Sequence, residues 1–157
     1  MAKKSELKRI EPFNPLDKEH LAESVSESMM ANAAVHLPPE PFIGAGVYAL
    51  YYAGKFPLYR RLVDANRVQP FRFPIYVGKA VPQGARKGGY GLGEDQGTAL
   101  CERLKDHASS IEASTNLNLS DFWCRFIVVD DIWIPLAESM MIKRYHPVWN
   151  QVIDGFG

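Results

Sequence analysis

The distribution of apolar and polar residues along the chain predicts three β-strands and four helices. Strands are favoured where β-branched and aromatic residues concentrate, and the predicted strands cover residues 43–52, 73–78 and 122–129. Helices are favoured where apolar residues recur every three or four positions, and these segments begin near residues 14, 58, 98 and 135. This mixture of elements predicts an α+β protein.

The N-terminal helix has the clearest start signal. Asn14 is the expected N-cap, and Pro15 occupies the first helical position. The apolar stripe of this helix consists of Leu16, Leu21, Val25 and Met29. The helix ends before the proline-rich segment 37–41, which we expect to act as a stiff connector.

Length and composition limit the class of protein. The chain has 157 residues, which is the length of one domain, and 46% of them are hydrophobic, so disorder of the whole chain is excluded. No apolar run reaches the roughly 20 residues that span a bilayer, and the first residues lack the apolar stretch of a secretory signal. We therefore expect a soluble, cytoplasmic protein without an organic cofactor. Cys101 and Cys124 form no disulfide or metal-binding pattern and are interpreted as structural residues.

The net charge is zero, but the charges are segregated along the chain. Residues 55–93 carry eight Lys or Arg side chains against Asp64 alone, a net charge of +7, whereas the segments before and after are acidic. A basic middle segment is typical of a surface that binds a phosphate backbone, although an ordinary solvated face has the same composition. Within it, residues 82–97 contain six glycines and predict a long, flexible surface loop, and such loops are usually functional.

Charged and polar residues interrupt the apolar stripes of the last two predicted helices. Arg103 and His107 lie one turn apart in the stripe of the helix that begins near residue 98, and Glu138 lies in the stripe of the last helix. Burial of an unpaired charge is costly, so these residues need a partner, a metal or a cleft. A structural ion pair between Arg103 and Glu138 remains open, as does a hydrogen-bonded core histidine at His107. Asn150 by itself is read as a turn residue.

Two tripeptides on the predicted strands give these polar residues a context. The first strand contains Gly46-Val47-Tyr48 and the second Tyr76-Val77-Gly78, and in this order they resemble the motif of GIY-YIG nucleases, with Val in place of Ile in both. The resemblance spans about residues 42–151. The later positions that match the family pattern, each on an element of the right type, are Arg103, His107, Glu138 and Asn150.

The resemblance implies a small, central, three-stranded, mainly antiparallel sheet flanked by helices. It implies a single nuclease domain over residues 1–157, with a core of about 42–151 and a helical extension of about 1–41. Basic insertions cover about residues 53–73 and 82–98, where relatives have short connections. Recognition built into insertions is similar to the type II restriction endonuclease branch, in particular the members that cleave CCGCGG.

The resemblance also implies a role for each site residue that handles charge. Glu138 is expected to hold one divalent ion per active site, most simply Mg²⁺, with waters and a phosphate oxygen as the other ligands. Arg103 is expected to bind the scissile phosphate. Lys79, directly after the second tripeptide, is expected to contact phosphate or to belong to a proton network.

The two tyrosines of the motif are expected to manage the attacking water. Tyr48 is the candidate general base, which requires positive charge nearby to lower its pKa from about 10, with Arg103, Lys79 and His107 as the sources. Tyr76 is expected to position the water or a phosphate oxygen. His107 is expected to accept a proton from Tyr48 or to bond the phosphate, and Asn150 to bond Tyr48 or to brace the backbone near it.

The sequence therefore predicts a Mg²⁺-dependent, sequence-specific endonuclease of double-stranded DNA. Because one site cuts one strand, cleavage of a palindrome implies a homodimer, at least on DNA. The candidates for DNA contacts in the basic segment are Arg60, Arg61, Arg67, Arg72, Arg86 and Lys87. The alternatives are a structure-specific repair or mobile-element nuclease of the same fold, and a noncatalytic nucleic-acid-binding module.

Overall fold

The computed structural model describes residues 9–14, 16–82 and 96–152. The helices are α1 (Lys18–Ala31), α2 (Arg60–Val68), α3 (Ala99–Glu112), α4 (Ile134–Tyr145) and α5 (Val148–Val152). The strands are β1 (Val35–His36), β2 (Gly46–Tyr52), β3 (Tyr76–Ala80) and β4 (Phe122–Val128). Short 3₁₀ turns lie at Pro57–Tyr59, Leu119–Asp121 and Asp131–Trp133. In the described ranges no helix is long and apolar enough to cross a membrane.

The strands form one antiparallel sheet in the order β1-β4-β2-β3. The predicted α+β fold with helices around an antiparallel sheet is confirmed. The sheet has a fourth strand, β1, which the sequence does not predict. It was missed because β1 has only two residues and directly precedes the proline-rich connector. Strand β3 lies at the opposite edge, so the second motif tripeptide begins an edge strand.

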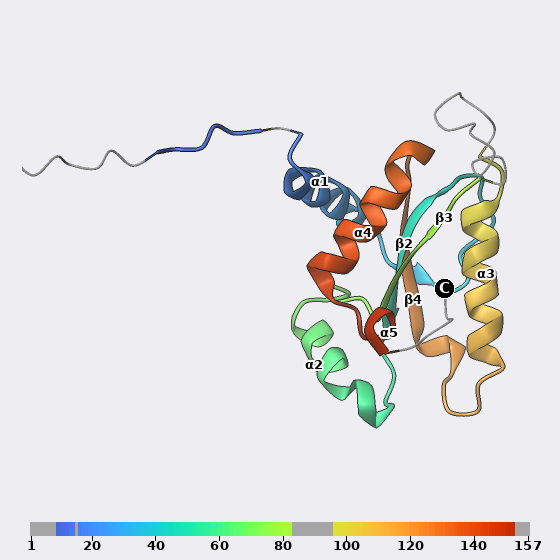
Figure 1. Cartoon of the computed structure of the whole chain (residues 1–157). Coiled ribbons are helices and arrows are strands. Elements are labelled where there is room, and N and C mark those ends of the chain that lie inside the picture. Colours follow the sequence, from blue (N-terminus) through green and yellow to red (C-terminus); the bar gives the residue numbers. More distant parts are fainter. Residues whose placement is uncertain (1–8, 15, 83–95, 153–157) are drawn as a thin grey trace, which may run out of the picture.

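Each face of the sheet is covered by a different set of helices. Helix α3 packs on one face, and α4 packs on the other with α1 beside it (Figure 1). Alternate residues of β2 supply both cores: Tyr48, Leu50 and Tyr52 face α3, whereas Val47, Ala49 and Tyr51 face α4. All seven residues of β2 are buried, because the strand is central and covered on both sides.

The first helix begins later than predicted. Asp17, not Asn14, is the N-cap, and its carboxylate accepts a hydrogen bond from the backbone N–H of Glu19 at 2.8 Å. The Asn14 side chain accepts from the Leu16 N–H, which makes a separate turn just ahead of the helix. Leu16 is exposed and does not join the predicted stripe, whereas Met29 is buried against the sheet.

Other differences concern the ends of elements. β2 starts at Gly46 and β3 at Tyr76, both later than predicted, because Gly44 bonds Gly97 and the backbone before β3 runs through a turn at Phe71 with φ of 50°. Asn150 lies in the short helix α5 and not in a turn. Both cysteines are buried and unbridged, as predicted for structural residues. Most of the predicted loop 82–97 lies outside the described residues.

Candidate active site

A cleft of about 440 Å³ opens at the β3 edge of the sheet, between α3 and α4. Strand β3 contributes Tyr76 and Lys79, α3 contributes Arg103, and α4 contributes Glu138. Residues from three elements that are far apart in the sequence therefore meet in one cavity. Tyr48 and His107 are not in the cleft wall; both are almost completely buried.

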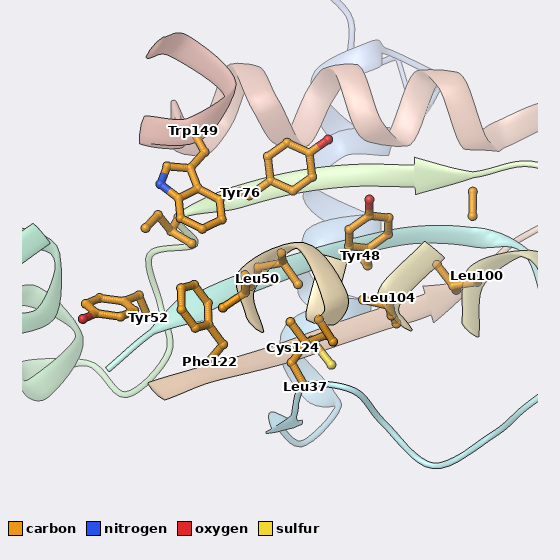
Figure 2. Packing of buried hydrophobic residues seen from close by; sticks show 14 of the residues in the cluster. Leu37, Tyr48, Leu50, Tyr52, Tyr76, Leu100, Leu104, Phe122, Cys124 and Trp149 are labelled. Atoms are coloured by element: carbon orange, nitrogen blue, oxygen red, sulfur yellow. The ribbon is translucent and has the colours of Figure 1, made fainter. Parts of the chain in front are cut away.

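Tyr48 and His107 form a buried pair next to this cleft. The Tyr48 hydroxyl lies 2.5 Å from Nε2 of His107, a short hydrogen bond. The Tyr76 ring packs close to both, with centroids 6.1 Å from Tyr48 and 5.3 Å from His107 (Figure 2 shows the two tyrosines on neighbouring strands). Tyr76 therefore separates the buried pair from the open cleft.

The two motif glycines are explained by close approaches within the sheet. A Cβ on Gly78 would lie 2.5 Å from the Tyr48 hydroxyl oxygen and 2.8 Å from the Tyr76 ring, because the Tyr48 ring passes over β3 at this point. A Cβ on Gly46 would lie 2.0 Å from the Ile127 carbonyl oxygen of β4. Gly78 thus makes room for the tyrosines, whereas Gly46 makes room for the neighbouring backbone.

Burial controls the protonation of His107. Removal of the ring from water, and second the nearby Arg103 guanidinium, lower the pKa of His107 to about 4. The imidazole is therefore neutral at pH 7, and the tautomer with its proton on Nδ1 leaves Nε2 as an acceptor for the Tyr48 hydroxyl. His107 is thus suited to accept a proton and does not supply positive charge.

The predicted lowering of the Tyr48 pKa is wrong for this state of the protein. Burial raises the pKa of Tyr48 well above 10, and the nearby Tyr76 raises it further. The Arg103 guanidinium opposes this shift but is outweighed. Two of the three residues expected to lower this pKa by their positive charge do not do so, because His107 is neutral and Lys79 is paired with Glu138. The phenol keeps its proton at neutral pH until another group takes it.

The structure also shows whether Arg103 and Glu138 form a structural ion pair. Glu138 is paired with the Lys79 ammonium, and among the described residues no ion pair joins Glu138 to Arg103. A structural Arg103–Glu138 pair is therefore excluded as the reason for the two charges in the helix stripes. Both side chains instead face the cleft from opposite sides, α3 and α4.

Asn150 braces the edge strand from its outer side. Its side-chain oxygen accepts from the Val77 N–H and its amide nitrogen donates to the Val77 carbonyl, both at 2.8 Å. The next backbone contact comes from Trp149, whose N–H donates to the Ile75 carbonyl at 3.0 Å. Of the two expectations for Asn150, the backbone brace matches the geometry. The edge groups of β3 are thereby satisfied beside Tyr76.

Glu138 places a carboxylate in an open cleft, and such a carboxylate fits a hard divalent cation that keeps most of its water. Glu138 is the only acidic residue that α4 contributes to the cleft, and no group of three or more His, Cys, Asp or Glu side chains forms a metal cage in the described part of the chain. Mg²⁺ binds in this way, through one or two carboxylates, waters and substrate phosphate. The donor set therefore fits a substrate-assisted Mg²⁺ site.

Two further cleft residues were not predicted from the sequence. Glu102 and Asp106 flank Arg103 on α3 and line the mouth of the cleft. Asp106 lies three positions after Arg103, which places the two side by side on the helix surface, and this spacing was the only available signal. They add negative charge next to the expected phosphate-binding arginine.

The predicted DNA-binding cations lie in different settings. Arg60 and Arg67 both pair with Asp64, at 3.8 Å and 3.2 Å, beside a hollow of about 350 Å³ at the start of α2. Arg61 and Arg72 are exposed, and no ion pair joins either to another described residue. Arg86 and Lys87 fall outside the described residues.

Comparison with known proteins places this geometry in a family. The sequence pattern of the family described as the Eco29kI GIY-YIG domain matches residues 40–157, which is more than half of the chain. The matched range includes every residue of the cleft. No curated protein matches the chain at a significant level. The chain therefore belongs to the Eco29kI GIY-YIG domain family of restriction endonucleases.

Proposed function

We propose that this protein is a Mg²⁺-dependent, site-specific endonuclease that hydrolyses phosphodiester bonds of double-stranded DNA. The observation that carries the proposal is the cleft in which Arg103 and Glu138 face each other beside the buried Tyr48–His107 pair. Because Eco29kI cleaves CCGCGG, a GC-rich palindrome of this kind is the expected target.

Arg103 binds the scissile phosphate from the α3 side of the cleft. Its planar guanidinium offers two parallel donors to two phosphate oxygens, which fixes the orientation of the phosphate. Tyr76, which lines the cleft, positions the attacking water or a phosphate oxygen. Glu138 would hold Mg²⁺, which when bound would supply positive charge to stabilise the transition state and the leaving 3′ oxygen.

Tyr48 and His107 remove the proton from water in a relay. The phenol proton moves to Nε2 of His107, and the phenolate oxygen takes the proton of the attacking water, so His107 ends as an imidazolium and Tyr48 as a phenol. The short hydrogen bond provides the path, and the neutral imidazole provides the acceptor. Because the raised pKa of Tyr48 opposes the first transfer, the relay depends on positive charge near Tyr48, and the Arg103 guanidinium, which lowers this pKa, supplies it.

DNA recognition uses the basic insertions on a two-fold homodimer. Arg61 and Arg72 have exposed side chains, and among the described residues neither forms an ion pair with a carboxylate. Arg60 and Arg67 become available when a phosphate competes with Asp64, and Arg86 and Lys87 complete the basic segment. A palindromic site read by two identical subunits gives the paired cuts of a double-strand break.

A plasmid assay tests this function. Plasmids with and without CCGCGG sites are incubated with the full chain and Mg²⁺ or EDTA, and the products are sequenced at their ends. The expected result is discrete, Mg²⁺-dependent fragments that share one cut sequence. Cleavage only at branches or flaps would replace the proposal by the repair-type alternative, and tight duplex binding without any cleavage would replace it by the binding-module alternative.

A further inference from the structure

The carboxylate assigned to the metal already has a cation bound to it. The Lys79 ammonium of β3 donates a hydrogen bond to Oε2 of Glu138 on α4, across the cleft. The Glu138 side chain is 17% exposed and the Lys79 side chain 40% exposed. The negative charge of this largely buried acid is therefore balanced by the ammonium of a side chain that still reaches solvent.

A divalent ion and the Lys79 ammonium compete for the same carboxylate. Like charges within a few ångströms repel, and the repulsion is stronger in a partly buried site than in water. A metal that ligates Glu138 therefore weakens the Lys79 contact, and a Lys79 that remains in place weakens the metal. The free energy of the Lys79–Glu138 contact is thus subtracted from the free energy of metal binding.

The Lys79 ammonium can move away from Glu138, because the side chain is flexible while the backbone is fixed. Its backbone is fixed by pairing with Val47 of β2, while its flexible stem carries a compact charge into an open cleft. Arg103, in contrast, is half-buried on α3 near Tyr48 and Tyr76, and in the described part of the chain no ion pair joins it to Glu138. Lys79 can therefore turn from Glu138 toward the phosphate side of the cleft without any change in the backbone.

We infer that Lys79 is the exchangeable counter-ion of the metal site. Its ammonium holds Glu138 in the metal-free protein, a divalent ion displaces it, and the released ammonium then joins Arg103 as a second cation for the substrate phosphate. This inference rests on the proposed function in one respect, the assignment of Glu138 as the metal ligand. It adds that the cleft becomes a phosphate site only as the metal arrives, which couples metal binding to substrate binding.

A metal titration without DNA tests the exchange. The binding of Mn²⁺, as a paramagnetic substitute for Mg²⁺, is measured by the loss of the free-ion resonance signal for the full chain and its variants. Lys79→Met and Lys79→Gln remove the competing charge, and both should bind Mn²⁺ about fivefold more tightly than the parent, the factor expected for a partly exposed ion pair. Lys79→Arg keeps the charge and should bind Mn²⁺ like the parent.

Lys143→Met is the matched control on the same helix as Glu138. Lys143 also forms a Lys–Glu pair, with Glu19 at 3.7 Å, but this pair is exposed and outside the cleft. The variant changes the net charge as Lys79→Met does and should leave Mn²⁺ affinity unchanged. Glu138→Gln should remove the site, and circular dichroism melts confirm that each variant is folded.

Each outcome separates the exchange from the proposed function. Unchanged or weaker Mn²⁺ binding by both neutral Lys79 variants overturns the inference, because the metal would then use the carboxylate while Lys79 stays. Undiminished binding by Glu138→Gln overturns it as well, because the ion would lie elsewhere. The titration contains no DNA, so a chain that fails the plasmid assay but shows the fivefold effect would lose only the proposed nuclease function.

Discussion

Two tyrosines on one strand show how the same residue type serves two purposes. Tyr48 and Tyr52 lie on β2, point to the same face of the sheet and are both buried (Figure 2). The Tyr52 hydroxyl accepts a hydrogen bond from the backbone N–H of Phe56 at 3.0 Å, whereas the Tyr48 hydroxyl is bonded to the basic nitrogen of His107. The partner, and not the burial, distinguishes them.

The difference divides this face into a closed end and an open end. At the closed end, Tyr52 packs with Tyr59 and Phe122, which both contact Trp149. The Trp149 indole donates to the Tyr59 hydroxyl at 2.9 Å. Helix α2 is anchored there through Val63. At the open end the aromatic packing gives way to the cleft. We therefore expect substitutions at the open end to change the rate of cleavage, and those at the closed end to change stability or DNA binding.

The largest effect is expected for Glu138→Gln at the open end. The substitution keeps the shape and removes the only charge that α4 offers to a metal, so the cleavage rate should fall roughly 10³-fold, about 4 kcal/mol in activation free energy. Duplex binding and the melting temperature should stay close to those of the parent. Single-turnover rates at saturating Mg²⁺ measure the effect, with exposed Glu112→Gln as control. A rate within tenfold of the parent would remove Glu138 from the mechanism.

The Tyr48→Phe and Tyr52→Phe pair tests the comparison directly. Each variant loses one buried hydroxyl from the same strand. Tyr48→Phe should reduce the single-turnover rate at least about a hundredfold, because the proton relay is broken. Tyr52→Phe should leave the rate nearly unchanged and lower the unfolding free energy by about 1 kcal/mol. Equal rates for the two variants would show that Tyr48 is a core residue like Tyr52.

His107→Gln should alter the pH dependence of stability. The pKa of His107 is about 4 in the folded protein, whereas an unfolded histidine titrates near 6.5, so the unfolded chain takes up the proton first as the pH falls. This contribution to stability is complete above pH 6.5 and is lost as the pH falls toward 4. Urea denaturation at pH 7 and pH 4.5 should show that the parent loses about 2 kcal/mol more than the variant.

A second histidine variant controls for the number of titrating groups. His36→Gln, at an exposed position of β1, also removes one histidine and should keep the acid sensitivity of the parent. If His107→Gln and His36→Gln gave the same pH dependence, the buried pair would not control protonation at the open end.

The smallest effect is expected for Arg61→Gln on α2, which is anchored at the closed end. Loss of one phosphate contact should lower the slope of log affinity against log salt by about 0.9, with the single-turnover rate at saturation unchanged. Binding is measured with Ca²⁺ in place of Mg²⁺ across a salt series, on specific and scrambled duplexes. A change in discrimination between the duplexes at constant slope would place Arg61 on a base instead. No change in either would remove α2 from the interface.

Much of the site could be predicted from the sequence, because charged and polar residues interrupt the apolar stripes of the helices. Arg103, His107 and Glu138 were identified as polar residues in apolar stripes, and the structure brings Arg103 and Glu138 into one cleft with His107 behind it. The family resemblance is confirmed by the match over residues 40–157. The catalytic roles themselves stay predictions, as do the domain boundaries.

The ion-pair partners of the site residues and their pKa values could not be predicted from the sequence. The Lys79–Glu138 pair joins residues 59 positions apart on β3 and α4, and the spacing along the chain gives no reason to prefer it over Arg103–Glu138. The Tyr48 pKa was predicted from nearby positive charges alone, and the prediction failed because burial has the larger effect. Edge strand β1 and helix α5 were missed because two and five residues are too short to show a period.

The sequence by itself determined the longer helices and strands, the family and the chemical types at the site, because hydrophobic period and motif order are properties of neighbouring residues. The tertiary structure alone decided which face each motif residue occupies and which partner it meets. Tyr48 and Tyr52 occupy alternate positions of one strand and face the same side, yet one meets a histidine from α3 and the other a backbone N–H. Desolvation and hydrogen-bond partners depend on segments that meet only when the chain folds, so the different environments of the two tyrosines belong to the fold.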